Sequence, residues 1–180
     1  MTSHRVASLF RYLDELELSL CLFFNRASHR RNIEHFFAVI SRLGNGVFWY
    51  SLMLVIAVLD YPDGLKAAFH MGAVSFAGLL IYRQMKGRMS RQRPSITWSQ
   101  IRRGAAPLDV YSFPSGHTLH AVSFTLISLF YYPALWWLLV PFTVLVALSR
   151  VILGLHYPTD VAAGALIGGG LALLSLKFVS

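Results

Sequence analysis

The sequence is poor in cysteine and in acidic residues. Cys21 is the single cysteine of 180 residues, so an internal disulfide is excluded and the redox compartment cannot be read from the composition. Eight Asp+Glu stand against 16 Lys+Arg, which gives a formal net charge of +8. Nucleic-acid-binding proteins often have such an excess of basic residues. The long apolar runs of this chain, however, leave little soluble surface that could contact a nucleic-acid groove. Anionic lipid head groups or a phosphate-bearing substrate fit the charge better.

The N-terminal region also lacks an uncharged apolar core. Acidic residues at positions 14, 15 and 17 interrupt its first apolar stretch, which argues against a cleaved signal peptide. Val6 to Phe24 instead has the mixed pattern of an amphipathic helix that lies in the membrane interface. Ile33 to Arg42 predicts a second amphipathic piece, and Gly44-Asn45-Gly46 predicts a turn. We therefore expect an interfacial N-terminal region over residues 1–44.

Apolar residues are abundant and fall in long runs. They make up 56% of the chain, and the mean hydropathy is +0.55, which is too apolar for an ordinary soluble domain. We predict an all-α fold, a multi-pass transmembrane helical bundle over residues 45–180. About five spans are expected, at Val47–Leu59, Leu65–Met85, His117–Tyr132, Ala134–Leu153 and Pro158–Phe178. The first is short for a span, and a start before the Gly44-Asn45-Gly46 turn is the alternative. In the last span Gly164 and Gly168 stand four apart, a spacing that allows another helix to approach closely.

The connectivity of these spans places the polar segments. The second and fourth spans end on one face of the membrane, and the third and fifth begin on that same face. The basic loop at residues 86–113 and the connection between the fourth and fifth spans must therefore lie on one side. Both segments carry polar residues of the kinds that bind phosphate.

Several of these residues indicate a site for an oxyanion. Lys86, Arg93 and Arg150 offer three cations, and Arg150 is informative because a charge within an apolar span costs about 2.5–3.5 kcal/mol. Ser115 offers a hydroxyl group. Gly116 lets the backbone approach an anion at the start of a helix, where N–H groups point outward.

Two histidines and one carboxylate complete the predicted site. His117 stands at the same helix start as Gly116, and His156 and Asp160 are four residues apart at the opening of the last span. That spacing would let Asp160 hold one imidazole nitrogen of His156 and leave the other free to attack. We see no carboxylate cluster near these residues that could hold magnesium, so we expect neither a metal nor a cofactor.

The chain resembles the type 2 phosphatidic acid phosphatase family, the lipid phosphate phosphatases. That family's three motifs are Lys, six residues, Arg-Pro; then Pro-Ser-Gly-His; then Ser-Arg, five residues, His, three residues, Asp. All three occur here in order, at Lys86/Arg93/Pro94, at Pro114 to His117, and at Ser149/Arg150/His156/Asp160. The resemblance covers roughly residues 45–178.

The resemblance implies a role for each of these residues. His156 would be the nucleophile that forms a phosphohistidine, Asp160 would orient it, and His117 would be the acid for the leaving group. Phosphate binding would fall to Lys86, Arg93, Ser115, Gly116 and Arg150. Family members commonly have six spans, and here the first is missing or replaced by the amphipathic N-terminus.

Other interpretations remain open for the basic residues and histidines. Lys86 and Arg93 sit among Arg83, Arg88 and Arg91, and a basic loop can simply hold anionic lipid heads. We interpret His120 as a polar residue near a helix start. The remaining histidines are expected at the surface or interface: His4, His29, His35 and His70.

The sequence leaves several functions to be distinguished. The first is hydrolysis of a lipid phosphate or pyrophosphate, such as undecaprenyl pyrophosphate, phosphatidylglycerophosphate, phosphatidate or a lipid A phosphate. The second is transfer of the phosphoryl group to another lipid from the same site. A haloperoxidase-like activity is disfavoured by five apolar spans, since those enzymes are soluble. A non-catalytic lipid-phosphate binding or transport protein is the fourth. The expected partners are a lipid substrate and membrane lipids, without nucleic acid, and the oligomeric state is not predicted.

The expected location is the cell (inner) membrane, and two arguments disagree about which face carries the site. The resemblance implies the outer face. The arginines favour the cytoplasmic face, because cytoplasmic loops carry the excess of Lys and Arg. Outside the motifs, only Lys66 and Lys177 are predicted on the opposite side. The site's side carries Arg5, Arg11, Arg26, Arg30, Arg31, Arg42, Arg83, Arg88, Arg91, Arg102 and Arg103.

Overall fold

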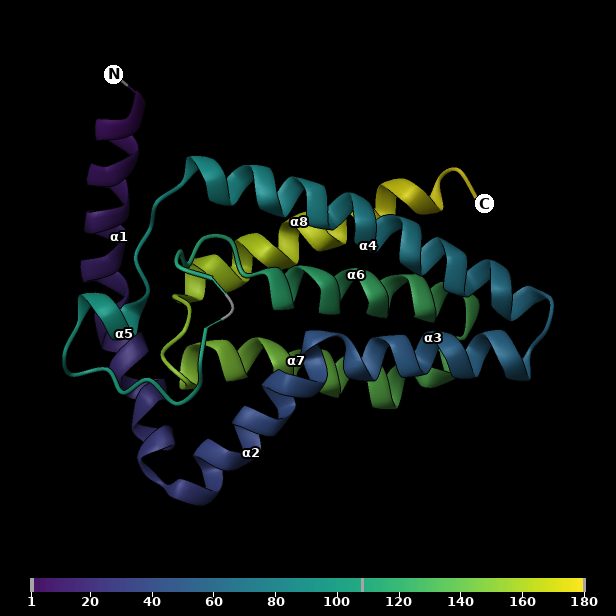
Figure 1. Ribbon diagram of the computed structural model, residues 1–180, viewed down its shortest axis with the longest axis horizontal. Coiled ribbons are helices and arrows are strands. Elements are labelled where there is room, and N and C mark those ends of the chain that lie inside the picture. Colours follow the sequence, from purple (N-terminus) through teal and green to yellow (C-terminus); the bar gives the residue numbers. More distant parts are fainter. Residues whose placement is uncertain (1, 108, 180) are drawn as a thin grey trace.

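The computed structural model of the chain describes residues 2–107 and 109–179, which form helices and connections without a strand. Helices α3, α4, α6, α7 and α8 run side by side as a bundle, and α1 crosses one end of it at a steep angle (Figure 1). The helices are α1 (Thr2–Asn25), α2 (Arg31–Arg42), α3 (Phe48–Leu59), α4 (Asp63–Arg88), α5 (Pro94–Thr97), α6 (Gly116–Tyr131), α7 (Trp136–Ile152) and α8 (Pro158–Leu176). Single 3₁₀ turns at Arg26–His29 and Pro133–Leu135 join neighbouring helices.

The prediction of an all-α membrane bundle is confirmed. Within the described residues, four helical stretches are long and apolar enough to cross a bilayer: Arg31–Leu59, Asp63–Arg88, Pro133–Ile152 and Pro158–Leu176. The predicted span from His117 to Tyr132 is α6, which has 16 residues and is shorter than those four. It nevertheless packs against α4, α7 and α8 in the bundle.

The first span begins before Gly44-Asn45-Gly46, which is the alternative that its short length left open. Gly44-Asn45-Gly46 does not reverse the chain, because a π-helical turn at Leu43–Val47 joins α2 to α3 across a kink. Gly46 has φ of 116°, which a side chain would disfavour. Gly44 is buried beside Val146 of α7. The glycines therefore bend a continuous helical stretch where it meets α7.

The centre of the bundle is aromatic and aliphatic. Trp49 of α3 stacks on Phe124 of α6 with ring centroids 5.2 Å apart, and Phe142 of α7 lies 5.5 Å from Trp49. Met71 and Leu139 are fully buried around them. These side chains supply the van der Waals contacts that hold helices together where lipid removes much of the hydrophobic driving force.

The predicted small-residue seam in the last helix is confirmed. A Cβ atom at Gly164 would lie 2.4 Å from the carbonyl oxygen of Ser115, and one at Gly168 would lie 2.1 Å from that of Leu119. The α8 backbone therefore touches the first turns of α6. The N–H of Ser115 donates to the carbonyl of Asp160 (3.0 Å), so two of the three motifs are joined directly.

Helix α1 has two faces of different character. Asp14, Glu17 and Cys21 are buried against the end of the bundle. The opposite face exposes apolar side chains at helical spacing, namely Leu9, Tyr12, Leu16, Leu20 and Phe23. A helix that crosses the bundle end thus presents its apolar stripe outward.

Candidate active site

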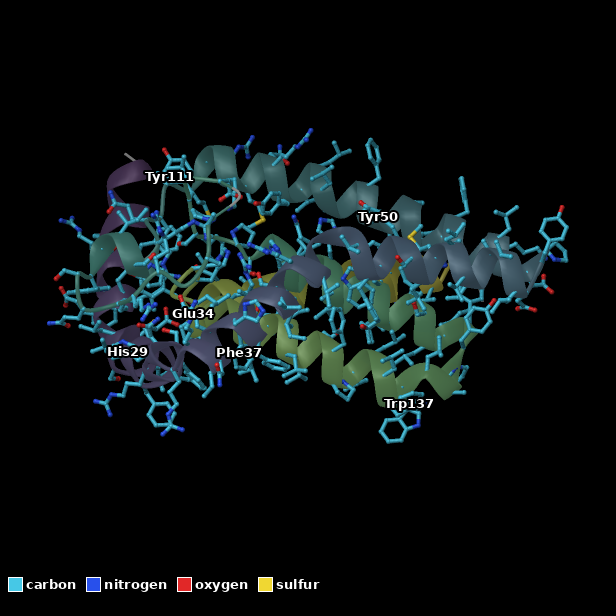
Figure 2. All side chains as sticks on the ribbon, turned by 60° about the horizontal axis from the view of Figure 1, so that its bottom comes forward. His29, Glu34, Phe37, Tyr50, Tyr111 and Trp137 are labelled. Atoms are coloured by element: carbon cyan, nitrogen blue, oxygen red, sulfur yellow. The ribbon has the colours of Figure 1, made fainter. Side chains whose placement is uncertain are left out.

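The three motifs meet at the end of the bundle that carries α1. The loop from α4 to α6 and the connection from α7 to α8 both lie there (Figure 1). Nitrogen and oxygen atoms of side chains gather at this end, whereas Trp137 points away from the bundle near the other end (Figure 2). The site is therefore assembled from two connections, and from the helix ends that flank them, which the membrane topology brings to one face.

His156 is placed by a tight turn after α7. Gly154 has φ of 68°, the left-handed conformation that commonly ends a helix, and a Cβ there would lie 2.7 Å from the carbonyl oxygen of Arg102. The N–H groups of Leu155 and His156 both donate to the carbonyl of Arg150, each at 3.0 Å. His156 is consequently folded back beside the end of α7 and is only 2% exposed.

The hydrogen bonds of His156 indicate its tautomer. Arg93 Nη1 lies 3.2 Å from Nε2 of His156 and 2.7 Å from the carbonyl oxygen of Leu155. A guanidinium can only donate, so Nε2 must accept and the ring proton must sit on Nδ1. Nδ1 lies 3.5 Å from Oδ2 of Asp160, close enough for an ion pair but without a hydrogen-bond partner. Asp160 thus faces the protonated nitrogen, as the spacing of the two residues predicted.

The surroundings of His156 keep its imidazole neutral. Burial holds the pKa of His156 well below 6.5, and the positive charges of Arg150, Arg93 and Lys86 lower it further. A neutral imidazole with an unprotonated Nε2 retains the lone pair that a nucleophile needs.

The three predicted cations lie in one electrostatic neighbourhood. Arg150 ends α7, is 2% exposed, bonds Ser41 of α2 through Nη1 and leaves its buried Nε without a partner. Lys86 ends α4 and interacts electrostatically with Arg93. Arg93 in turn interacts with Arg150. The fold thus brings together cations that the sequence placed in two separate motifs, Lys86 and Arg93 in the first and Arg150 in the third.

Asp109 is a member of this cluster that the sequence analysis did not single out. Its carboxylate accepts from Lys86, from Tyr82 and from Arg93 Nη2, the last at 2.6 Å. Burial acts to raise the pKa of Asp109, but the hydrogen bonds from Lys86 and Tyr82 outweigh it and leave the pKa lowered. An ionised carboxylate therefore binds two of the three cations. A lone Asp in a polar loop gave no pattern that could have found it.

The Pro-Ser-Gly-His motif forms the start of α6. Ser115 is the N-cap residue, and its buried hydroxyl accepts from the N–H of Thr118 at 3.5 Å. Gly116 packs its α-carbon against the ring of Tyr82, where a Cβ would lie 2.7 Å away. His117 lies within electrostatic range of the Arg150 guanidinium and of the His156 ring. The N-terminus of α6, with its unpaired N–H groups and positive dipole end, thus belongs to the site.

A cavity connects this helix start to the bundle interior. Its volume is about 410 Å³, within the range of small-molecule sites. Gly116 and His117 line it at the site, Trp49 and Phe76 line its apolar part, and the kink at residues 44–46 lies at its edge. His120 also lines it and shares a hydrogen bond of 3.2 Å with Ser75.

Arg91 was grouped with the basic loop in the sequence analysis, and the structure corrects that interpretation. It is buried, and it forms ion pairs with Asp14, Glu17 and Asp160. The fold therefore gathers three carboxylates next to the site, although the sequence showed no such cluster. A guanidinium occupies their centre. The signal that could have found them is the spacing of Asp14 and Glu17 on one face of an apolar helix.

No metal centre is evident in the part of the chain that the structure describes. Among residues 2–107 and 109–179, no group of three or more His, Cys, Asp and Glu side chains is arranged to hold a metal ion.

The comparison with protein families decides the assignment. A family model described as the PAP2 superfamily matches residues 64–180. The chain belongs to the PAP2 superfamily. With its four long apolar helices, it is a multi-pass membrane protein of that superfamily.

Individual relatives agree with this assignment. The chain is 41% identical to an undecaprenyl-diphosphatase of Sulfolobus acidocaldarius over 71 residues. The matched segment covers 39% of this chain but only about a third (34%) of that relative. It is 26% identical to a lipid A 4'-phosphatase of Bacteroides thetaiotaomicron over 89% of this chain and 76% of the relative. The crystal structure of Aquifex aeolicus LpxE superposes with a TM-score of 0.78 at 25% identity, covering 90% of this chain and 95% of that one.

Proposed function

We propose that this chain removes phosphate from membrane lipid phosphates or diphosphates, without a metal, through a phosphohistidine at His156. The placement of His156 carries the proposal. Its Nε2 accepts a hydrogen bond from Arg93, its Nδ1 faces Asp160, and its pKa is held well below 6.5 by burial and by neighbouring cations. This arrangement supports a neutral nucleophile whose Nε2 lone pair points to Arg93, one of the cations proposed to bind the phosphate. The lone pair would become free to attack when Arg93 donates to the bound phosphate instead.

The substrate phosphate would be bound by charge and by backbone donors. Lys86, Arg93 and Arg150 supply the cations, and the buried Nε of Arg150 is a donor without a partner. The start of α6 supplies the Ser115 hydroxyl and the N–H groups near Gly116. Fixed donors of this kind stabilise negative charge on the equatorial oxygens during phosphoryl transfer.

The first chemical step would transfer the phosphoryl group to His156. The Nε2 lone pair forms a bond to phosphorus while the bond from phosphorus to the bridging oxygen breaks, leaving its electron pair on that oxygen. His117 gives a proton to the oxygen, and the negative charge of the bound phosphate favours that proton on His117 beforehand. Asp160 stabilises the positive charge that develops at Nδ1 of His156.

The second step would restore the enzyme. His117, now neutral, takes a proton from water as the water oxygen attacks phosphorus. The bond between phosphorus and Nε2 breaks, and its electrons return to the ring of His156. Inorganic phosphate leaves, and His117 is again protonated.

The cavity supports a lipid as the substrate. It runs from His117 to apolar side chains such as Trp49 and Phe76 between helices of the bundle, so a chain attached to the phosphate would find an apolar path. Two relatives are named as phosphatases of undecaprenyl diphosphate and of lipid A. We infer the same substrate class, a phosphate or diphosphate on a membrane lipid.

The outer face of α1 supports a location in the membrane interface. Its exposed apolar residues, Leu9 to Phe23, would enter the head-group boundary, while exposed arginines such as Arg11 and Arg26 would meet anionic lipids. We therefore infer that residues 1–44 include an interfacial helix and that the protein resides in the cell (inner) membrane.

Trapping the intermediate tests the mechanism. The purified chain is incubated with ³²P-labelled lipid substrates and quenched in alkali, where phosphohistidine persists. We expect label on the wild-type chain, and neither label nor turnover in His156→Ala. His35→Ala, a change at an exposed histidine, is the matched control and should behave as wild type.

His117→Ala should slow release of a lipid alcohol by about 10²–10⁴-fold.

Two outcomes would contradict the proposal. Turnover above a few per cent in His156→Ala would exclude His156 as the nucleophile. Binding of the labelled lipid without release of phosphate would favour a binding or transport protein. Analysis of the labelled product separates water from a second lipid as the acceptor, because inorganic phosphate and a new lipid phosphate migrate differently.

A further inference from the structure

Arg91 connects α1 to the carboxylate beside the nucleophile. It lies two residues before the second motif cation, and its side chain is completely buried. Nε donates to Asp14 (2.8 Å) and Nη2 to Glu17 (2.8 Å), while Nη1 donates to Thr159 Oγ1 (2.7 Å) and to Asp160 Oδ1 (2.6 Å). All of its charged donors are therefore directed at α1 and at the first turn of α8.

The contact between α1 and α8 is also direct. Glu17 Oε1 accepts the N–H of Thr159 at 2.7 Å, and Oε2 accepts the Thr159 hydroxyl at 2.6 Å. Thr159 precedes Asp160 in the first turn of α8. Glu17 thus satisfies one of the unpaired donors at that helix start and fixes the turn that carries Asp160.

Asp160 has little freedom left. Arg91 binds its Oδ1, the N–H of Tyr157 donates to Oδ2 at 2.9 Å, and the residue is fully buried. Oδ2 is the oxygen that faces Nδ1 of His156 at 3.5 Å. The direction in which Asp160 points toward the histidine is consequently set by Arg91 and the backbone.

We propose that Arg91, clamped by Asp14 and Glu17 of α1, is a positioning residue that acts on His156 through Asp160. The N-terminal amphipathic helix is then part of the machinery for phosphoryl transfer, in addition to any contact with lipid. The proposal rests on the phosphohistidine function given above. Arg91 itself touches neither the substrate phosphate nor the imidazole; it holds the carboxylate that must stay ionised and aligned.

The charged groups around Arg91 allow the proposal to be tested through the pH dependence of activity. Asp14, Glu17 and the thiol of Cys21 face it from α1, Asp160 faces it from α8, and Tyr157 stacks on the guanidinium at 4.0 Å. Among the described side chains, the carboxylates of Asp14, Glu17 and Asp160 form ion pairs with one permanent cation, Arg91. Removing it favours protonation of Asp160 and of His156, whereas removing a carboxylate of α1 disfavours both.

The two kinds of change should therefore move the pH profile in opposite directions. Arg91→Gln should shift the acid limb of kcat/KM up by about 1 pH unit or more, and Asp14→Asn should shift it down. Arg91→Gln should also lower kcat by about 10–100-fold, with KM changed less than about threefold because the phosphate-binding cations remain. Arg91→Lys keeps the positive charge but loses the planar guanidinium with its fixed set of donors. It should therefore restore the acid limb to its wild-type position but restore kcat only in part.

The control is Arg88→Gln, which removes an exposed arginine three residues earlier in the chain. It should match wild type in kcat, KM and pH profile. Parallel losses without opposite shifts of the acid limb would mean that Arg91 only holds the fold, and would overturn the proposal. If Arg91→Gln does not accumulate in membranes, Asp14→Asn decides alone, because an acid limb identical to wild type overturns the inference.

The failure of this inference is distinct from the failure of the proposed function. If wild type forms labelled phosphohistidine that His156→Ala lacks, the function stands whatever the Arg91 variants do. If wild type forms none, the function itself is wrong.

Discussion

Asp109 shares the cations that would bind the substrate phosphate. Its carboxylate contacts Lys86 and Arg93, so those two cations and Arg150 carry a combined charge of +2 rather than +3 when Asp109 is included. A dianionic phosphate matches that charge, and its entry must compete with a carboxylate already in place. Asp109 thus limits how tightly a phosphate, including the inorganic product, can be held.

Removing this carboxylate should strengthen inhibition by the product. Asp109→Asn is expected to lower the Ki of inorganic phosphate by about tenfold, equivalent to about 1.4 kcal/mol, because the anion no longer displaces a charge. The Ki is measured against turnover of a lipid substrate. Asp63→Asn, at an exposed ion pair with Lys66, is the control and should leave the Ki unchanged. A Ki that rises in Asp109→Asn would show that Asp109 orders the cations rather than competes for them.

Arg150 is placed to use the shape of its guanidinium. Its guanidinium is buried, donates a hydrogen bond to Ser41 through Nη1 and leaves Nε unpaired. One edge of the planar group therefore fixes its position, and another edge carries a donor that could bind a phosphate oxygen. A lysine would supply a single point charge in its place. We expect Arg150→Lys to lower kcat/KM by about 10²-fold or more, measured as phosphate release from lipid in detergent.

The neighbouring Arg42→Lys provides the comparison for that variant. Arg42 is exposed near the end of α2, one residue after Ser41, and its substitution should leave kcat/KM at the wild-type value. Near-normal activity in Arg150→Lys would mean that only the charge at this position matters.

The gathering of the motif residues at one end of the bundle was predictable, because each motif stands at the end of a span and the connectivity brings those ends to one face. The partners of Arg91 were not, because Asp14 lies 77 positions and Asp160 lies 69 positions away from it in sequence. Nothing in a basic loop distinguishes an arginine that meets lipid heads from one that is buried among carboxylates. The acidic residues of α1 carried the missing signal, since charge on the buried face of an apolar helix requires a partner.

At the level of elements, the seam between α6 and α8 sets the geometry of the site. Gly164 and Gly168 let α8 touch the backbone of Ser115 and Leu119. Ser115 caps the helix that carries His117, and its N–H is bonded to the carbonyl of Asp160. The distance between the two helices therefore sets the distance between His117 and Asp160, the residues proposed to act as the acid and to orient the nucleophile.

Adding one methyl group to this seam should damage both stability and activity. In Gly164→Ala the new Cβ would lie 2.4 Å from a backbone oxygen, which cannot rotate away. We expect a loss of about 1–3 kcal/mol in stability, seen as a lower Tm in detergent, together with reduced kcat. Gly170→Ala is the matched control, since a Cβ there meets no atom within 4 Å. Equal Tm values for the two variants would contradict the close approach.

At residues 44–46 the sequence predicted a turn, and the structure has a kink within a helical stretch instead. Two glycines around an asparagine have the composition of a turn, and the sequence prediction ended the interfacial region there. In the structure α2 packs against α7, and Gly44 meets Val146, so the helical stretch continues through a bend. Packing against α7 thus overrides the turn propensity of the glycines. A bilayer adds to this effect, because backbone N–H and C=O groups within it must be hydrogen-bonded inside the protein.

At the level of the whole molecule, charge is distributed unevenly between the two ends. Arg91, Arg93 and Arg150 are buried in the site, so they cannot act as surface charges. The exposed arginines of the site end remain numerous: Arg11, Arg26, Arg30, Arg31, Arg42, Arg83, Arg88, Arg102 and Arg103. At the other end Lys66 and Lys177 are exposed. The asymmetry thus survives the removal of every buried arginine.

This asymmetry predicts that the site end faces the cytoplasm. Ser99 is exposed in the long loop and Cys21 is buried, so a Cys21→Ser, Ser99→Cys chain carries one accessible thiol at the site end. A membrane-impermeant maleimide should label it only after lysis. Phe178→Cys in the same Cys21→Ser background reports on the opposite end, where Phe178 is 89% exposed, and should be labelled in intact cells. The reverse pattern would place the site outside, as the resemblance to the family implies.

The short length of α6 bears on how deep in the bilayer the proposed reaction would take place. Its 16 residues rise about 24 Å, whereas a hydrocarbon core is about 30 Å thick. Trp136 and Trp137, both 63% exposed, follow its far end and suit the boundary with water there. The first turn of α6, with Ser115 and His117, then lies about 6 Å beneath the other boundary. A substrate phosphate would then have to sink below the plane of its neighbours to be cleaved, and thicker bilayers should slow that descent.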